Sequence, residues 1–446
     1  MERIIPRPPY GPAMPRAKVA VVGLGYVGIP LSVLLADSGC DVVGVDVVAE
    51  RALKINEGIL PLKGDEPGLA DLLEDVVKKG RLRASTDFSA CADRDAVFVC
   101  VDTPIDEEHR PNNSRLVAAA TGIGEHMRKG TLVVVESTVA PGTMLKVFAP
   151  ALERASRMSV GRDFKLAFCP ERVMPGRLIH NLRTYDRVLG GYDRQSVARA
   201  TAIYSRFMNG KLHPTDLTTA EIVKTAENAY RDVQIAFANE VALVCEELGA
   251  DAFEVRRLVN TCPFRDMHVP GAGVGGHCLP KDPWLLVHGG KGAKPRLIPT
   301  AREVNDSMPG HVIDLACAML EKAKIERRKA NVAVMGASFL QESGDIRNSP
   351  SLPVIHAFAR SARLTVHDPY VVQLDGVEAT KDIGAALEDA DIAIFMVAHR
   401  QYSRISANML KKLMRTPMVV DGRDLFSAER MRKAGVQYAG VGKGLI

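Results

Sequence analysis

The stretch KVAVVGLGYVG, from Lys18 to Gly28, decides the fold of the first part of the chain. Its β-branched run predicts a buried strand over 18–22, and the glycine-rich turn leads into an apolar, helix-compatible run over 29–37. A second strand is expected over 41–45, with Asp46 directly after it. A strand, a tight turn, a helix and a second strand together indicate a βαβ unit of a parallel sheet.

The three glycines of this turn each have a physical purpose. Gly23 permits the tight turn, Gly25 lets backbone approach a pyrophosphate, and Gly28 lets the helix pack closely on the strand. Asp46 lies where a carboxylate can accept hydrogen bonds from the ribose of NAD and repel the 2′-phosphate of NADP. The alternative is a βαβ turn that binds nothing, and the acidic residue in register disfavours it. The sequence therefore predicts an NAD site.

The rest of the chain continues the alternation of strands and helices. Further strands are expected at 96–101, 131–136, 165–169, 331–335, 363–367, 391–397 and 418–420, and one long helix from about 215 to 247. The second α/β region has only Gly336 after its first strand, so it is not expected to hold a second dinucleotide. We predict an α/β protein with two Rossmann-like doubly wound domains joined by a long central helix. The expected domains are an NAD-binding domain at 18–213, a central helical domain at 214–310, and a second Rossmann-like domain at 311–446.

Composition excludes several classes of protein. The net charge of +5 is spread over 446 residues without a basic block, so no nucleic-acid partner is expected. No apolar run reaches the roughly 18 residues needed to cross a bilayer. Residues 1–17 are rich in Pro and Arg without an apolar core, and we expect a disordered leader, not a signal peptide. The eight cysteines form no CxxC pair, which disfavours disulfides and a metal site and indicates a reducing cytoplasm.

The segment GAGVGGHCLPKD, residues 271–282, is the second informative stretch. Four glycines within six residues are costly in conformational entropy, and such a loop usually approaches a ligand or exposes a side chain. It delivers Cys278 close to Lys281 and to a helix-like run at 284–287. A thiol near a helix start and a cation titrates below the ordinary pKa of about 8.5, which favours the nucleophilic thiolate. A buried inert thiol is the alternative, and it suits Cys40, Cys91, Cys100, Cys245 and Cys317 better.

An NAD site combined with a nucleophilic cysteine suggests a double oxidation. One hydride transfer converts an alcohol to an aldehyde, which a thiolate can trap as a thiohemiacetal. A second hydride transfer gives a thioester, which water hydrolyses to the acid.

Several motifs recur in the order typical of one family. They are GLGYVG at 23–28, VDTP at 101–104, ESTVAPGT at 136–143, CPERV at 169–173, EIVKTAEN at 221–228, GVGGHCLPKD at 273–282, GDIRNSP at 344–350 and DGR at 421–423. In this order they resemble the UDP-glucose/GDP-mannose dehydrogenase family. The resemblance implies three domains, of which 214–310 would carry the dimerisation surface and 311–446 would bind the UDP-sugar. It also implies a homodimer or larger assembly, and four-electron oxidation of a UDP- or GDP-sugar at C6.

The resemblance also implies roles for individual residues. NAD would be contacted by Tyr26, Val27, Asp46, Arg51, Thr103, Thr138 and Arg347. Cys278 would be the nucleophile, Lys224 and Asn228 would stabilise the oxyanion, and Asp282 and Glu171 would position or activate water. The sugar nucleotide would be held by Arg172, Val173, Lys224, Asn228, Arg231, Gly275, Phe339 and Arg423, and by Arg265 reaching into the partner subunit. Without the resemblance, Lys224 would be read as a solvated lysine and Asp282 as a helix cap.

Two features favour an acetamido sugar over glucose. The segment PERVMPGR at 170–177 replaces a PEFL-type segment, and His277 precedes the cysteine where glucose enzymes carry Ser. The expected substrate is UDP-N-acetylmannosamine, with UDP-N-acetylglucosamine, UDP-N-acetylgalactosamine or UDP-glucose as alternatives. A one-step hydroxyacid-type dehydrogenase and a catalytically silent nucleotide-sugar-binding protein are the alternatives of other kinds. The chain departs from the family at Leu340, where a lysine that contacts substrate is usual.

Overall fold

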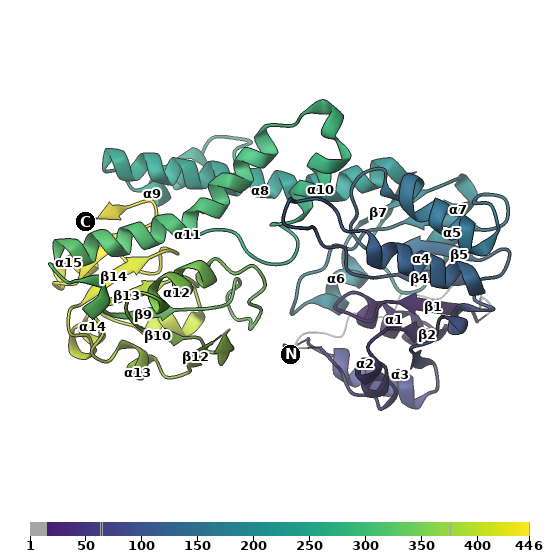
Figure 1. Ribbon diagram of the computed structural model, residues 1–446, viewed down its shortest axis with the longest axis horizontal. Coiled ribbons are helices and arrows are strands. Elements are labelled where there is room, and N and C mark those ends of the chain that lie inside the picture. Colours follow the sequence, from purple (N-terminus) through teal and green to yellow (C-terminus); the bar gives the residue numbers. More distant parts are fainter. Residues whose placement is uncertain (1–15, 63, 65, 375, 446) are drawn as a thin grey trace. The chain divides into compact units, whose positions relative to one another are not determined.

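The computed structural model describes residues 16–62, 64, 66–374 and 376–445. The expected disordered leader therefore lies outside the described residues, apart from its last two. The chain divides into two compact units, each built around its own sheet (Figure 1). The first unit comprises residues up to 227 together with 284–293, and the second comprises 228–283 together with 294–446.

The first unit contains an eight-stranded sheet in the order β3-β2-β1-β4-β5-β6-β7-β8. Its first six strands follow the order of a dinucleotide-binding sheet and are all parallel, whereas β6 and β7 are antiparallel. The elements are β1 (Lys18–Val22), α1 (Gly28–Asp37), β2 (Asp41–Val45), α2 (Ala49–Asn56), α3 (Leu69–Lys78), β3 (Leu82–Ser85), η1 (Phe88–Cys91), β4 (Ala96–Val99), α4 (Ser114–His126), β5 (Leu132–Val135), η2 (Met144–Phe148), α5 (Ala149–Ser156), β6 (Lys165–Phe168), α6 (Leu178–Thr184), β7 (Arg187–Gly191), α7 (Arg194–Tyr204) and β8 (Leu212–Asp216).

The second unit repeats this architecture in the order β11-β12-β10-β9-β13-β14-β15-β16. The strands from β12 to β15 are parallel, and one antiparallel strand closes each edge. The elements after the central helices are η4 (Arg327–Lys329), β9 (Asn331–Met335), α12 (Ser351–Ala359), β10 (Arg363–His367), β11 (Gln373–Leu374), β12 (Val377–Thr380), α13 (Ile383–Leu387), β13 (Ile392–Phe395), η5 (Arg400–Arg404), α14 (Ala407–Leu413), β14 (Met418–Asp421), α15 (Ala428–Lys433), β15 (Gln437–Gly440) and β16 (Gly444–Leu445).

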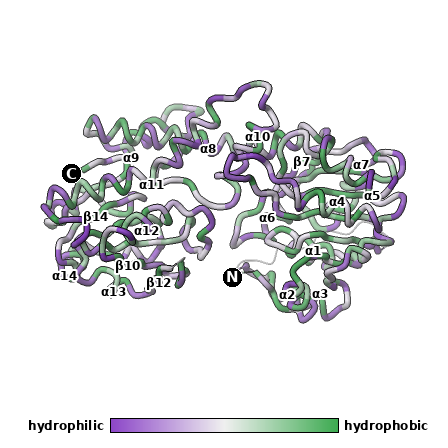
Figure 2. The backbone as a smooth tube through the Cα atoms, viewed as in Figure 1, coloured by the Kyte–Doolittle hydropathy of each residue, from purple (hydrophilic) through white to green (hydrophobic). Residues whose placement is uncertain are grey.

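Each sheet is buried on both faces, which explains why its central strands read as continuous apolar runs. In β1, Val19 and Val21 pack into one hydrophobic core, whereas Ala20 and Val22 pack into another. The residues of β9 divide between two further cores in the same way. Figure 2 shows the same concentration of apolar residues along the strands of both sheets. The predicted α/β fold with two Rossmann-like sheets is confirmed.

Helix α8 (Leu217–Leu248) is the long central helix and runs from the first unit into the second. The remaining elements of this region are α9 (Ala252–Val259), α10 (Asp282–Gly289), η3 (Lys291–Ala293) and α11 (Leu297–Lys322). Part of the apolar face of α8 is exposed, including Tyr230, Phe237, Val244 and Leu248. Within the described residues, no helix has both the length and the apolar character required to cross a membrane.

Candidate active site

The glycine turn after β1 has the geometry that a dinucleotide requires. Gly23 has φ +91°, and a Cβ there would lie 2.6 Å from the carbonyl oxygen of Cys100. At Gly28 a Cβ would lie 1.8 Å from the carbonyl oxygen of Gly23, so the helix can approach the turn only without a side chain. A Cβ at Gly25 would meet nothing within 4 Å. The turn therefore has no room for a side chain at Gly23 and Gly28, where it packs. It has open space at Gly25, where a pyrophosphate would lie at the start of α1.

Asp46 lies at the end of β2 and is nearly buried. Its Oδ2 accepts hydrogen bonds from Leu24 N at 2.7 Å and Arg51 Nη1 at 2.8 Å, and its Oδ1 accepts one from Val48 N at 2.9 Å. A carboxylate offers about four lone-pair directions, so the described residues leave one on Oδ1 for a ribose hydroxyl. Asp46 and Arg51 are thus brought together, with Arg51 paired to the acid.

The other predicted NAD contacts of the first unit lie at neighbouring strand ends. Thr103 follows β4 and Thr138 follows β5, and Thr103 Oγ1 donates to the carbonyl oxygen of Thr138 at 2.6 Å. Tyr26 and Val27 are half-buried in the glycine turn, and Val27 precedes the first residue of α1. Because the carboxyl ends of parallel strands share one edge of the sheet, these residues form one cradle together with Asp46.

Glu221 is a functional candidate without an assigned role in the sequence. It is fully buried on α8, and its carboxylate accepts hydrogen bonds from Gly142 N at 2.8 Å and Met144 N at 2.7 Å. Burial raises the pKa of Glu221 to about 7, against the opposing effect of these backbone donors. The bonds tie the turn that follows Thr138 to the helix that carries Lys224. The motif EIVKTAEN contained Glu221, but sequence alone gave no partner for it.

Lys224 and Glu171 are brought together in the first unit. Lys224 is 6% exposed, and its Nζ lies 3.9 Å from Glu171 Oε1. Glu171 Oε2 also accepts a hydrogen bond from Val173 N at 2.6 Å, which fixes the predicted substrate segment at this point. The burial of Lys224 contradicts its reading as a solvated helix residue.

Arg172 is oriented by an acidic partner that the sequence did not indicate. It forms an ion pair with Glu227 of α8 and donates from Nη1 to the carbonyl oxygen of Asp186 at 2.6 Å. Its guanidinium is therefore held by protein groups in this structure. Any contact with a phosphate would share or displace the pair with Glu227.

In the second unit the cysteine loop packs against the segment that follows β9. A Cβ at Gly275 would lie 2.6 Å from Phe339 Cβ, and one at Gly276 would lie 2.8 Å from the ring of Phe339. Gly276 N donates to the carbonyl oxygen of Arg347 at 2.9 Å, and Asn348 Nδ2 donates to the carbonyl oxygen of Gly276 at 3.0 Å. The glycines of the loop thus permit backbone to lie against Phe339, two residues before Cys278.

Cys278 is half-buried and lies in a turn that leads into α10. Its carbonyl oxygen accepts hydrogen bonds from Lys281 N at 3.1 Å and Asp282 N at 2.8 Å. Asp282 is fully buried and is the first residue of α10, with Oδ2 bound by Asn228 Nδ2 at 2.6 Å and Oδ1 lying 2.8 Å from Lys281 Nζ. Asn228 follows Lys224 by one turn of α8. The structure therefore joins the predicted Cys278, Asn228 and Asp282 within one unit, and Asp282 binds side chains of Asn228 and Lys281.

The predicted arginines differ in their surroundings. Arg423 follows β14 and donates from Nε to the carbonyl oxygen of Met396 at 2.8 Å, and burial lowers its pKa to about 10. Arg347 lies in the second unit, where it pairs with Asp345. Arg231 and Arg265 are exposed. Arg265 lies next to the fully exposed Phe264.

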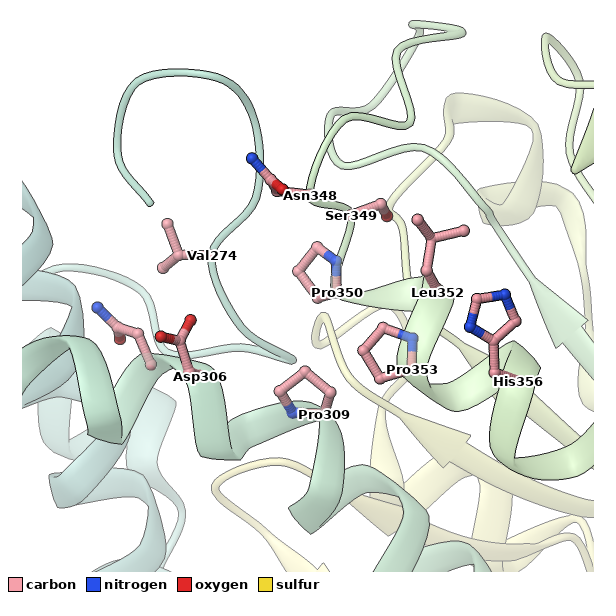
Figure 3. Close-up of a pocket in the computed structure, with 10 residues that line it drawn as sticks. Val274, Asp306, Pro309, Asn348, Ser349, Pro350, Leu352, Pro353 and His356 are labelled. Atoms are coloured by element: carbon pink, nitrogen blue, oxygen red, sulfur yellow. The ribbon is translucent and has the colours of Figure 1, made fainter. Parts of the chain in front are cut away.

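One cavity of about 390 Å³ adjoins the cysteine loop within the second unit (Figure 3). Its wall combines Val274 of that loop with residues of α11, of α12 and of the segment leading into α12. The lining residues are Val274, Asn305, Asp306, Pro309, Asn348, Ser349, Pro350, Leu352, Pro353 and His356. Within the described part of the chain, no cluster of three His, Cys, Asp or Glu side chains could hold a metal ion.

Comparison with known proteins identifies the family of this chain. Family models of the UDP-glucose/GDP-mannose dehydrogenase family match residues 17–208 as the NAD binding domain, 218–307 as the central domain and 333–428 as the UDP binding domain. A UDP-N-acetyl-D-mannosamine dehydrogenase of Pyrococcus horikoshii is 36% identical over 429 residues, covering 96% of this chain and 99% of its own. An NDP-N-acetyl-D-galactosaminuronic acid dehydrogenase of Ralstonia nicotianae is 35% identical over 425 residues, covering 93% and 97%.

Solved structures give the same result. The structure of UDP-D-ManNAc dehydrogenase from Pyrococcus horikoshii has a TM-score of 0.89 at 36% identity and covers 96% of this chain and all of its own. An NDP-N-acetyl-D-galactosaminuronic acid dehydrogenase from Methanosarcina mazei has a TM-score of 0.87 at 38% identity, covering 96% of both chains. The chain belongs to the UDP-glucose/GDP-mannose dehydrogenase family and is an NAD-dependent nucleotide-sugar dehydrogenase.

Proposed function

We propose that this enzyme oxidises UDP-N-acetyl-D-mannosamine twice at C6, to UDP-N-acetyl-D-mannosaminuronate, through covalent intermediates on Cys278. The observation that carries the proposal is the linkage of the cysteine turn to α8. Asp282 accepts a hydrogen bond from Asn228, and its backbone N–H donates to the carbonyl oxygen of Cys278. This joins the nucleophile's turn to the helix that carries Lys224 one turn earlier.

NAD supplies the hydride acceptor for both oxidations, and the turn at 23–28 fits it. Gly25 leaves room for the pyrophosphate, Asp46 keeps one acceptor direction for a ribose hydroxyl, and Thr103 and Thr138 border the same edge of the sheet. Arg347 is proposed as a further contact from the second unit.

The chain's own residues carry the covalent steps. The first oxidation leaves an aldehyde at C6, to which the Cys278 thiolate adds, forming the C–S bond of a thiohemiacetal. Loss of a second hydride from C6 gives the thioester, and attack by water then breaks the C–S bond and releases the carboxylate and the thiol. The buried ammonium of Lys224 and the amide of Asn228 stabilise the oxyanion of each tetrahedral adduct. Glu171 or Asp282 orients the water and accepts its proton.

The identity of the sugar is supported by the relatives. The Pyrococcus horikoshii protein is named for UDP-N-acetyl-D-mannosamine, whereas the Ralstonia and Methanosarcina proteins are named for an N-acetylgalactosaminuronic acid. UDP-N-acetylgalactosamine is therefore the second candidate, and UDP-N-acetylglucosamine and UDP-glucose remain further candidates. In each case Arg172, Val173, Arg231, Gly275, Phe339 and Arg423 are proposed to line the site.

The assembly is proposed to be a dimer through α8. Tyr230, Phe237, Val244 and Leu248 expose apolar area along α8, and such a face is covered in most soluble proteins. Arg265 would then serve the partner subunit's site. We propose functional domains at 18–213, 214–310 and 311–446, and a cytoplasmic reaction, since the eight free thiols suit a reducing compartment.

The test counts NADH released per sugar consumed. Purified enzyme with NAD and the four UDP-sugars should release two NADH for each molecule of UDP-N-acetylmannosamine. One NADH per sugar would indicate a one-step dehydrogenase, and no turnover with any sugar would indicate a silent binding protein. The ranking of kcat/KM across the panel decides the sugar.

Cys278→Ser tests the covalent route, with Cys262→Ser as the matched control because Cys262 is exposed and is not one of the proposed site residues. We expect Cys278→Ser to lose at least about 10³-fold in uronate formation, the scale on which nucleophiles contribute, while Cys262→Ser keeps full activity. Complete double oxidation by Cys278→Ser would rule out the thioester.

A further inference from the structure

His399 is a fully buried histidine in the loop that follows β13. Its Nε2 lies 3.2 Å from Asp368 Oδ2 and 3.5 Å from Ser338 Oγ. Its Nδ1 accepts a hydrogen bond from Glu342 N at 3.1 Å. The imidazole therefore spans Asp368, at the end of β10, and the loop 338–342, which follows β9.

These bonds fix the form of the ring. A backbone N–H can only donate, so Nδ1 must be the unprotonated nitrogen, and Nε2 then carries the proton that it donates to Asp368. A neutral histidine in this single tautomer satisfies both neighbours. The arrangement is not that of a nucleophile and base, because Ser338 and Asp368 share the same ring nitrogen and Ser338 Oγ donates to the carbonyl oxygen of Leu340 at 2.9 Å.

The loop that His399 holds contains a residue in an unfavourable conformation. Glu342 has φ 56°, in the left-handed region that costs a non-glycine residue free energy. Three contacts hold it there: His399 binds its N–H, Arg400 N donates to Oε1 at 2.8 Å, and Tyr370 Oη donates to Oε2 at 3.0 Å. Two of these three partners, His399 and Arg400, are adjacent residues at the start of η5.

The loop 338–342 packs directly against the cysteine loop 271–282. Phe339 lies inside 338–342, and its N–H donates to the carbonyl oxygen of Asp345 at 3.0 Å. Its side chain fills the space beside Gly275 and Gly276. A displacement of 338–342 would therefore move the surface on which the backbone before Cys278 rests. All of these contacts lie within the second unit.

We infer that His399 is a positioning residue for nucleotide-sugar binding: through Glu342 and Ser338 it sets the position of Phe339, and thereby of the Gly275–Gly276 backbone. The inference rests on the proposed function, because it assumes that Phe339 and the cysteine loop receive the UDP-sugar. His399 itself is fully buried and acts through the loop.

A buried histidine with a purely structural role is the competing explanation, and His367 provides the matched control. His367 is equally buried at the end of β10, but its Nδ1 lies 2.8 Å from Tyr402 Oη and its Nε2 lies 3.3 Å from the carbonyl oxygen of Lys381. A substitution there removes comparable buried bonds without a direct contact to the loop 338–342.

The experiment compares His399→Asn, His399→Gln, His399→Phe and His367→Asn in the full-length enzyme. An Asn amide reaches the place of Nδ1 and can accept from Glu342 N–H, whereas a Gln amide reaches the place of Nε2 and keeps only the bond to Asp368. We expect His399→Phe to raise the KM for the UDP-sugar and the Kd for UDP roughly tenfold, the scale of two lost hydrogen bonds. The KM for NAD should stay within about twofold, and affinity should follow the order wild type, Asn, Gln, Phe.

The outcomes separate the two proposals. If wild type neither binds UDP in calorimetry nor oxidises a UDP-sugar, the proposed function fails. If wild type does both and His399→Gln and His399→Asn keep its KM and Kd, the positioning role is overturned. Equal losses of UDP affinity in His367→Asn and His399→Asn would also overturn it, since that result indicates general destabilisation. Should His399→Phe fail to fold, the order of the Asn and Gln variants still decides.

Discussion

The same kind of glycine turn follows β1 in the first sheet and β9 in the second, but the groups around the two turns differ in what they leave free for a ligand. In the first unit Gly23 N donates to the carbonyl oxygen of Val45, and in the second Gly336 N donates to that of His367. Each second strand ends in an aspartate, Asp46 or Asp368, whose carboxylate accepts a hydrogen bond from the residue after the glycine. The local architecture is therefore repeated down to single hydrogen bonds.

The two units differ in how many hydrogen bonds each aspartate accepts. Asp46 accepts three and keeps one lone-pair direction. Asp368 receives five, from the backbone of Ala337, Ser338, Tyr370 and Val371 and from His399. A carboxylate with five donors has no acceptor left for a ribose, so this aspartate holds loops instead of a ligand.

The residue two positions after the first glycine completes the contrast. The first unit has Gly25, where a Cβ would meet open space, and the second has Ser338, whose hydroxyl binds the loop itself. Shared topology thus does not imply a shared ligand, because binding depends on which acceptors and which spaces remain unfilled.

Gly25→Ser should have the largest effect, because it gives the first unit the residue found in the second. A Cβ at this position meets no protein atom within 4 Å, so the melting temperature should change little. It would occupy the space for the pyrophosphate, and we expect NAD affinity to fall at least about 100-fold. Calorimetric titration with NAD measures this, and unchanged affinity would show that the pyrophosphate lies elsewhere.

Asp368→Asn should mainly affect stability. The amide nitrogen of Asn cannot accept from the backbone donors that surround it, and buried donors left without acceptors cost about 1–3 kcal/mol. We expect a loss of about 2–3 kcal/mol in the free energy of unfolding of the second unit, read from hydrogen exchange in β9 and β10. NAD affinity should not change, and a parallel loss in the first unit's strands would contradict the assignment.

The same variant should change the response to acid. Burial alone would raise the pKa of Asp368, but the hydrogen bonds from His399 and the backbone outweigh it and lower the pKa. A carboxylate whose pKa is lower in the folded state stabilises the protein above its unfolded pKa of about 3.9, and this contribution is lost as the pH falls below it. Wild type should lose this stability below about pH 4, and Asp368→Asn should lack that part of the decline.

Asp46→Ser should have a smaller effect, on the choice of coenzyme. Removing the carboxylate ends the repulsion of a 2′-phosphate and releases Arg51, which now pairs with Asp46 at 2.8 Å. We expect kcat/KM with NAD to fall about 10–30-fold and that with NADP to rise, the size of one or two hydrogen bonds to a charged group. Steady-state rates with both coenzymes measure it, and Asp46→Ser combined with Arg51→Ala should remove the gain with NADP.

Sequence patterns predicted the strongly patterned elements and missed the rest for physical reasons. The apolar runs of β1, β2 and β9 matched the structure, because strands buried on both faces are apolar throughout. The edge strand β8 (LHPTD) is largely exposed and has no such pattern, and it was not predicted. The candidate site residues were identified mainly through ordered motifs. Their partners Glu227 and Glu221 were not, because only tertiary contacts reveal which acid faces which arginine or backbone turn.

Ser338→Gly is the reverse exchange and should have the smallest effect. It restores a glycine to the second unit, but the five donors on Asp368 remain, so no NAD site is created. The variant loses the contacts of the Ser338 hydroxyl with the carbonyl oxygen of Leu340 and with His399 Nε2, and it gains backbone freedom in the loop beside Phe339, each worth about 1 kcal/mol or less. We expect a twofold to fivefold rise in the KM for the UDP-sugar, roughly the size of such a loss, and unchanged stoichiometry of NAD binding in calorimetry. Binding of a second NAD by this variant would show that the glycine, and not the acceptors of the aspartate, distinguishes the two halves.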